Sequence, residues 1–230
     1  MAEHTLLVVR ALNVSYGESK VVFDASLDVE PNQIVSCVGR NGAGKTTLVK
    51  TIGGFLKPTD GQILYRGTDV RGMPSYDVAK MGLRYIAQDK KVFSDLTVAE
   101  NLELASYATG DRDWEPVLNF FPKLRELLDR KAGYLSGGER QMLMIGRAIL
   151  GDPHLLLVDE PTEGLAPSIV EQLCDIFLEL SKHCALIIVE QNLSLVSRIS
   201  HKVYAMKEGR IVSEVTEPDD IKNVVFEKYL

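Results

Sequence analysis

Cysteine and histidine are scarce in this chain of 230 residues, which holds three of the first and four of the second. The cysteines are odd in number and have no C-x-x-C spacing, so neither a disulfide framework nor a zinc site is expected, and buried thiols in a reducing cytoplasm fit better. The histidines are scattered along the chain. The sequence therefore predicts no metal centre built from these two residue types.

Long hydrophobic runs and blocks of basic residues are missing as well. The longest apolar runs, such as 155–158 and 185–189, have the length of strands, and the first residues lack the layout of a signal peptide. The net charge is −6, with both signs spread along the chain. We therefore expect a soluble protein that does not bind nucleic acid. With 45 % apolar residues, the length suits one large α/β domain.

Residues 39–47 have the spacing G-x-x-x-x-G-K-[ST]. They lie between an apolar run, 34–38, that predicts a buried strand and an amphipathic run, 46–55, that predicts a helix. Such a loop points backbone N–H groups at a phosphate, and the positive end of the helix dipole adds to the attraction. A glycine-rich turn with an incidental lysine is the alternative. We expect Lys45 to contact the β and γ phosphates and Thr46 to bind Mg²⁺. The residues expected to hold a nucleotide are Gly39, Asn41, Gly42, Ala43, Gly44, Lys45, Thr46 and Thr47.

Residues 6–14 and 21–29 alternate between apolar and polar, as half-buried antiparallel strands do. Tyr16 lies on the turn between them, where its ring either stacks on the adenine of a bound nucleotide or simply packs. Further along, we predict strands over 61–66 and 83–87 and a helix over 75–81. Gln88 follows the strand over 83–87, and ligands of α/β sheets bind at such carboxyl ends.

The region 89–133 has a helical character, and Thr97 with Glu100 forms a capping box. We expect 89–133 to be a small helical subdomain inserted into a single domain. Residues 1–88 and 134–230 would then form the α/β nucleotide-binding core.

The stretch 135–141, Leu-Ser-Gly-Gly-Glu-Arg-Gln, opens a predicted helix that runs to Leu150. A capping box of Ser136 with Glu139, followed by turn glycines, is one explanation. Two glycines in a first helical turn cost up to about 1 kcal/mol each relative to alanine, so a compensating role is expected. The start of this helix, with Ser136, Gly137 and Gly138, is a second candidate anion site.

An apolar run, 155–158, ends in Asp159 and Glu160. At the carboxyl end of a buried strand, Asp159 can hold Mg²⁺ through its hydration shell, and Glu160 can take a proton from a water aimed at the γ-phosphate. Asp-Glu-Pro as a plain strand end is the alternative. The last buried strand, 185–189, is followed by Gln191, and 203–206 with 210–215 predict a closing hairpin before a terminal helix.

The phosphate loop, Gln88, the stretch 135–141 and the acidic strand end together resemble the ATP-binding subunits of ABC transporters over nearly the whole chain. The resemblance implies a P-loop NTPase core with an N-terminal antiparallel β subdomain and an inserted helical subdomain. It also implies a head-to-tail dimer, in which 39–47 of one subunit faces 136–138 of the other across ATP. Within it, Gln88 senses Mg²⁺ and the attacking water, Glu160 is the base and Tyr16 stacks on adenine.

Two positions depart from that family. Five residues after Pro161 the family usually has an aspartate, and this chain has Ala166. Two residues beyond the last buried strand the family usually has a histidine that contacts the γ-phosphate, and this chain has Gln191. An amide still donates a hydrogen bond but cannot become a cation, so Gln191 should assist the transition state less. The stretches 141–148, 161–167 and 189–192 look like importer subunits for branched-chain amino acids and for urea or short amides. Many of the former carry glutamate where this chain has Gln88.

The expected function is ATP hydrolysis, with ATP and Mg²⁺ as cofactors, that energises import of a small polar solute, first among them branched-chain or other amino acids. The implied partners are transmembrane permease subunits, a second ATP-binding subunit, identical or paralogous, and indirectly an extracytoplasmic solute-binding protein. This places the chain at the cytoplasmic face of the plasma membrane. A urea or short-amide importer and a soluble assembly ATPase without transport are the alternatives.

Overall fold

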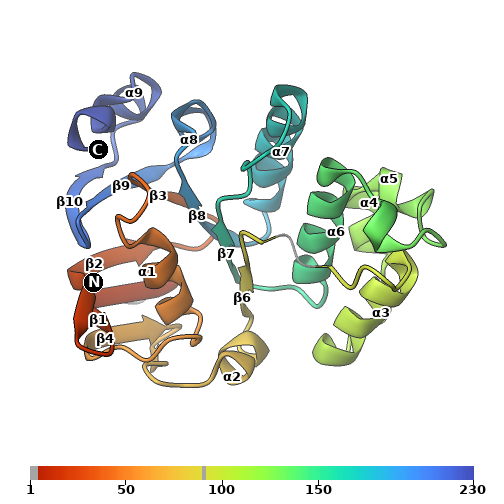
Figure 1. The fold of residues 1–230 in the computed structure, drawn as a ribbon, viewed down its shortest axis with the longest axis horizontal. Coiled ribbons are helices and arrows are strands. Elements are labelled where there is room, and N and C mark those ends of the chain that lie inside the picture. Colours follow the sequence, from red (N-terminus) through yellow and green to blue (C-terminus); the bar gives the residue numbers. More distant parts are fainter. Residues whose placement is uncertain (1–4, 90–91) are drawn as a thin grey trace.

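The computed structural model describes residues 5–89 and 92–230. Their strands form a four-stranded sheet in the order β2-β1-β4-β5 and a six-stranded sheet in the order β10-β9-β3-β8-β7-β6. Figure 1 shows the smaller sheet beside α1, at the end of the molecule opposite to helices α3 to α6. The fold is therefore the expected α/β core with an antiparallel N-terminal sheet.

The smaller sheet is built on the hairpin of β1 (Leu7–Tyr16) and β2 (Ser19–Val29), which pair antiparallel as predicted. Strand β4 (Asp60–Tyr65) pairs with the other edge of β1, and β5 (Thr68–Asp69) extends it. Tyr16 ends β1, at the tip of the hairpin.

The larger sheet has a parallel centre. Strands β3 (Ile34–Val38), β8 (Ala185–Glu190) and β7 (Leu155–Asp159) are buried at every residue, as parallel strands covered on both faces are. The remaining strands are β6 (Leu83–Ile86), β9 (Lys202–Lys207) and β10 (Arg210–Val215), of which β10 returns antiparallel to β9. Because parallel strands end at one edge, the residues that follow β3, β6, β7 and β8 are brought together there.

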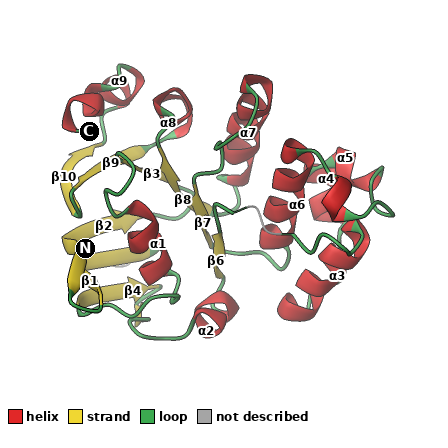
Figure 2. Ribbon diagram, viewed as in Figure 1, coloured by secondary structure: helices red, strands yellow, loops and turns green. Residues whose placement is uncertain are grey.

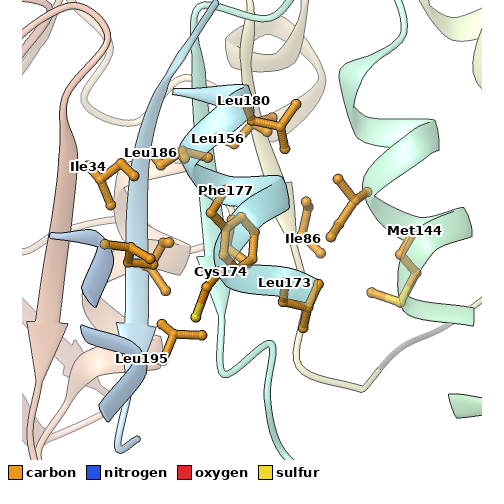
Figure 3. Close-up of a cluster of buried hydrophobic side chains, with 14 of the residues drawn as sticks. Ile34, Ile86, Met144, Leu156, Leu173, Cys174, Phe177, Leu180, Leu186 and Leu195 are labelled. Carbon is orange, nitrogen blue, oxygen red and sulfur yellow. The ribbon is translucent and has the colours of Figure 1, made fainter. Parts of the chain in front are cut away.

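Hydrophobic clusters cover the two faces of this sheet. One joins α1 (Lys45–Ile52) and the smaller sheet to side chains such as Cys37 and Leu157. The other joins α7 (Pro167–Leu180) and α8 (Leu193–Ile199) to the opposite face. In Figure 3, Cys174 and Phe177 of α7 lie over the strands that carry Leu156 and Leu186. Both faces of the strands that lead to the site are thus fixed by packing.

A group of helices lies beyond β6. Helices α3 (Val98–Thr109), α4 (Glu115–Phe120) and α5 (Pro122–Arg125) pack on α6 (Gly137–Ile149), and Figure 2 shows them apart from the smaller sheet. The capping box of Thr97 and Glu100 is confirmed. The helical character expected of 89–133 is thus confirmed in α3, α4 and the short helix α5.

The predicted terminal helix is wrong in its extent. The chain forms α9 (Pro218–Lys222) and then a 3₁₀ turn (Val225–Tyr229). Val224 separates them with a φ of 55°, a left-handed conformation that is unfavourable for a β-branched residue and that interrupts the helix. Helix α2 (Ser75–Lys80) agrees with its prediction. Within 5–89 and 92–230, no helix has both the length and the apolar character needed to cross a membrane.

Candidate active site

The phosphate loop connects β3 to α1, as its spacing predicts. Gly42 and Gly44 have φ values of 81° and 99°, and Gly44 is the N-cap of α1. Glycine adopts this left-handed backbone without the steric penalty of a side chain. The loop borders a cavity of about 280 Å³. The cavity is lined by residues 41–47 together with Val21, Gln88 and Glu160.

Lys45 is almost fully buried at the start of α1, with 4 % of its surface exposed. Its Nζ donates to the carbonyl oxygens of Gly39, at 2.8 Å, and Arg40, at 3.1 Å. It also lies 3.4 Å from Oε1 of Glu160. The ammonium group is therefore held at the mouth of the loop, within reach of an anion in the cavity.

Asp159, at the end of β7, is buried between two hydroxyl groups. Its Oδ1 accepts a hydrogen bond from Thr46 Oγ1 at 3.0 Å, and its Oδ2 accepts one from the Tyr85 hydroxyl at 2.8 Å. Burial raises the pKa of Asp159, and the two hydrogen bonds oppose that shift. Burial, together with the neighbouring Asp159 charge, also raises the pKa of Tyr85, so this phenol stays a donor. A threonine hydroxyl beside a carboxylate at a phosphate loop is an oxygen donor set suited to Mg²⁺.

Glu160 lies at the centre of the polar side chains. Its φ is 44°, a strained conformation for glutamate. Its Oε2 accepts a hydrogen bond from Gln88 Nε2, and its Oε1 accepts one from Gln191 Nε2, both at 3.0 Å. Gln88 also donates to Glu163 Oε2 at 2.9 Å, and Gln191 to Asn41 Oδ1 at 2.7 Å. Residues that follow three different strands thus converge on one carboxylate beside the phosphate loop.

Glu190 was not singled out from the sequence, yet its carboxylate accepts four hydrogen bonds in the interior. Oε1 receives the backbone N–H and the hydroxyl of Thr162, at 2.9 and 2.7 Å. Oε2 receives the backbone N–H groups of Gln191 and Asn192, at 2.9 and 3.1 Å. Glu190 therefore ties the turn after Glu160 to the segment that carries Gln191.

Tyr16 does not line the cavity but contacts Thr47, which does. Its hydroxyl is 3.4 Å from Thr47 Oγ1 on α1, and half of the residue is exposed. The structure thus brings the hairpin of the smaller sheet against the helix that follows the phosphate loop. The exposed ring is available for stacking, and the adenine contact stays a prediction.

The start of α6 lies apart from this cluster, since none of residues 136–138 lines the cavity at the phosphate loop. The capping box is confirmed, with Ser136 N donating to Glu139 Oε2 at 2.8 Å and Glu139 N to Ser136 Oγ at 3.3 Å. Gly138 is buried, and a Cβ there would lie 3.1 Å from Ile169 of α7. Gly137 is exposed and would have only an ordinary contact. Internal packing therefore explains Gly138 but not Gly137.

The fold and the site define a nucleotide-binding α/β protein whose phosphate loop adjoins an acidic strand end. The chain belongs to the ABC transporter family, which matches residues 22–163, and it is an ATP-hydrolysing subunit.

Relatives align along most of the chain. It is 38 % identical over 206 residues to the high-affinity branched-chain amino acid transport ATP-binding protein BraG of Pseudomonas aeruginosa, covering 87 % of this chain and 88 % of that protein. It is 37 % identical over 223 residues, 94 % of each chain, to the probable branched-chain amino acid transport ATP-binding protein LivF of Archaeoglobus fulgidus. A solved ATP-binding cassette of an ABC transporter in its ADP conformation has a TM-score of 0.88 at 29 % identity, covering 98 % of this chain and 96 % of that one.

Proposed function

We propose that this ATPase energises the import of branched-chain amino acids through transmembrane permease subunits at the cytoplasmic face of the membrane. The observation that carries the proposal is the similarity, along 94 % of both chains, to a probable branched-chain amino acid transport ATP-binding protein. A second, structural support is that Gln88 of the polar site is followed in the chain by Asp89, which lines a large groove.

The proposed roles of the site residues follow from their chemistry. Lys45 and the backbone N–H groups of the loop bind the β and γ phosphates. Thr46 and Asp159, with the side-chain oxygen of Gln88, hold Mg²⁺, which supplies charge neutralisation at the phosphates. Glu160 accepts the proton of the attacking water, which Gln88 and Gln191 orient through their amide groups. Tyr16 stacks on the adenine.

The second ATP-binding subunit, identical or paralogous, is proposed to contribute Ser136, Gly137 and Gly138 to the γ-phosphate. Support comes from the exposure of Ser136 and Gly137 and from Tyr134, which is 73 % exposed just before them. Open N–H groups at a helix start attract phosphate, and the bare Gly137 lets that phosphate come close.

This dimer has a direct test in two variants. Glu160→Gln should bind ATP, hydrolyse it about a hundredfold more slowly or worse and accumulate as an ATP-dependent dimer in size-exclusion chromatography. Ser136→Arg should bind ATP as the unmodified chain does and fail to dimerise. Full turnover in Glu160→Gln would contradict the base assignment, and equal loss of binding and dimerisation in Ser136→Arg would make the stretch merely structural.

The permease is proposed to dock in a groove of about 1040 Å³. One wall of the groove is formed by α2 and β6, and the other by α3 and α6. Aromatic side chains on its walls are half exposed or more, as is typical of a protein docking surface: Phe55, Tyr76 and Phe93. The groove also reaches Asp89, the residue after Gln88. A helix of the permease in this groove would therefore be next to the segment that senses the nucleotide.

A charge introduced into the groove should release the permease. Tyr76→Glu, whose side chain is 63 % exposed on α2, should abolish co-purification with multi-spanning proteins from gently solubilised membranes. The matched control is Tyr107→Glu on α3, which is 66 % exposed and outside the groove. If both variants retain the membrane proteins, the groove is not the docking site. If the unmodified chain recovers only soluble proteins, the transporter proposal itself fails.

The solute is tested by uptake in cells that carry only the Glu160→Gln chain. Loss of leucine uptake with urea uptake unchanged is the expected result. If urea uptake alone is lost, the solute is urea or a short amide and the proposal of branched-chain amino acids is wrong.

A further inference from the structure

The turn between β9 and β10 touches the phosphate loop. Glu208 and Gly209 form this two-residue turn with φ values of 47° and 79°, the left-handed pair that a tight hairpin requires. The N–H of Gly209 donates to the carbonyl oxygen of Ala43 in the phosphate loop at 3.0 Å. Its carbonyl oxygen accepts the N–H of Phe23 in β2 at 2.8 Å. One residue thus joins the phosphate loop to the smaller sheet by backbone hydrogen bonds on both sides.

The fit at this junction leaves no room for a side chain. A Cβ on Gly209 would lie 2.1 Å from the carbonyl oxygen of Val21 and 2.7 Å from Cδ2 of Phe23. The carbonyl oxygen of Val21 belongs to the backbone, so a change of side-chain rotamer cannot relieve this contact. From the other side, a Cβ on Gly44 would lie 3.0 Å from Cε of Met206 in β9, and one on Gly39 would lie 2.4 Å from the carbonyl oxygen of Met206. Hairpin, loop and β2 are therefore packed backbone to backbone.

We propose that Gly209 is a positioning residue for nucleotide binding, which fixes the distance between the phosphate loop and the sheet that carries Tyr16. The phosphates and the adenine of one nucleotide would contact these two parts, so their spacing decides whether both ends bind together. A side chain at 209 displaces the hairpin from β2 and breaks the hydrogen bond to Ala43. The proposal rests on the nucleotide site proposed above.

The chain supplies a matched control in a second turn of the same kind. Arg66 and Gly67 join β4 to β5 with φ values of 50° and 77°, and a Cβ on Gly67 would have no atom within 4 Å. Alanine at 67 or at 209 carries the same backbone strain, because both glycines have nearly the same positive φ. The difference between the two variants therefore measures the displacement at the junction alone.

The experiment compares Gly209→Ala with Gly67→Ala by calorimetric titration with MgATP, after urea unfolding has shown that both variants are folded. We expect Gly209→Ala to weaken ATP binding by about tenfold or more and Gly67→Ala to change it by less than about twofold. Equal affinity in the two variants would overturn the inference. Lys45→Ala separates this failure from that of the site, because ATP binding unchanged by Lys45→Ala would overturn the nucleotide site itself.

Hydrogen exchange on the unmodified chain gives an answer even if Gly209→Ala does not fold. On addition of MgATP, the Gly209 amide should exchange more slowly together with the amides of the phosphate loop, while the Gly67 amide should be unaffected. Protection of the loop amides without protection at Gly209 would show that the hairpin does not hold the loop in its binding position.

Discussion

Replacing Glu190 by glutamine should lower both the stability of the chain and its turnover of ATP. Glu190 is 3 % exposed, and its carboxylate accepts hydrogen bonds from four donors, two on each oxygen. Glutamine keeps one acceptor oxygen, which can retain the N–H groups of Gln191 and Asn192. Its NH₂ group then faces Thr162, whose hydroxyl can turn and accept, but whose buried N–H loses its partner.

The cost follows from that one orphaned donor. A hydrogen bond to a charged acceptor contributes roughly 1.5–3 kcal/mol, so Glu190→Gln should lower the free energy of unfolding by about 2 kcal/mol. Urea unfolding measures this change in the free energy of unfolding. Glu171→Gln, on the exposed face of α7, is the control and should change the free energy by less than about 0.5 kcal/mol.

The turnover of ATP shows whether Glu190 positions the site residues or only stabilises the fold. Thr162 follows Glu160 by two residues, and Gln191 contacts Glu160 directly, so loosening both should lower kcat by about tenfold or more while the KM for ATP changes little. The assay is run well below the unfolding temperature at saturating ATP. A loss of stability with kcat unchanged would refute the reasoning, because Glu190 would then only hold the fold together.

Two further predictions concern neighbouring residues. Gln191→His should leave ATPase activity intact or raise it, because a histidine cation would add charge stabilisation at the γ-phosphate; a loss as large as that of Glu160→Gln would contradict this. Asp159→Asn should stabilise the nucleotide-free chain at pH 7 while weakening Mg²⁺-dependent ATP binding. Burial raises the pKa of Asp159, so the native state takes up this proton before the unfolded chain does as the pH falls. The unmodified chain should therefore gain stability from this group between that raised pKa and the ordinary value of 3.8, and the variant, followed by urea unfolding against pH, should lack this gain.

Local sequence patterns were enough for the elements that hold the site. The spacing of 39–47, between a buried strand and a helix, predicted the loop, and both flanking elements are confirmed. The approach of Gln88 and Gln191 to Glu160 was also foreseeable, because each follows a predicted strand of one parallel sheet and such strands end at a common edge.

Contacts that depend on strand order could not be found in this way. Tyr85 reaches Asp159 because β6 neighbours β7, and Glu190 reaches Thr162 because β8 lies on the other side of β7. Similarly, Gly209 meets the phosphate loop only because β9 pairs with β3. The sequence showed a tyrosine, a glutamate and a turn glycine without showing which strands would be adjacent.

The convergence on Glu160 explains how a glutamine can stand at position 191. Lys45 is shared between Glu160 and two loop carbonyls, and a bound phosphate competes for the same ammonium group. Once Lys45 turns to phosphate, the uncharged amides of Gln88 and Gln191 remain as donors to Glu160 and orient its oxygens. An amide also donates its hydrogen bond equally at every pH near neutrality, whereas an unperturbed histidine side chain has a pKa of about 6.5. Residue 191 of the unmodified chain should therefore contribute no ionisation to the pH profile of ATPase activity in that range, and Gln191→His should introduce one.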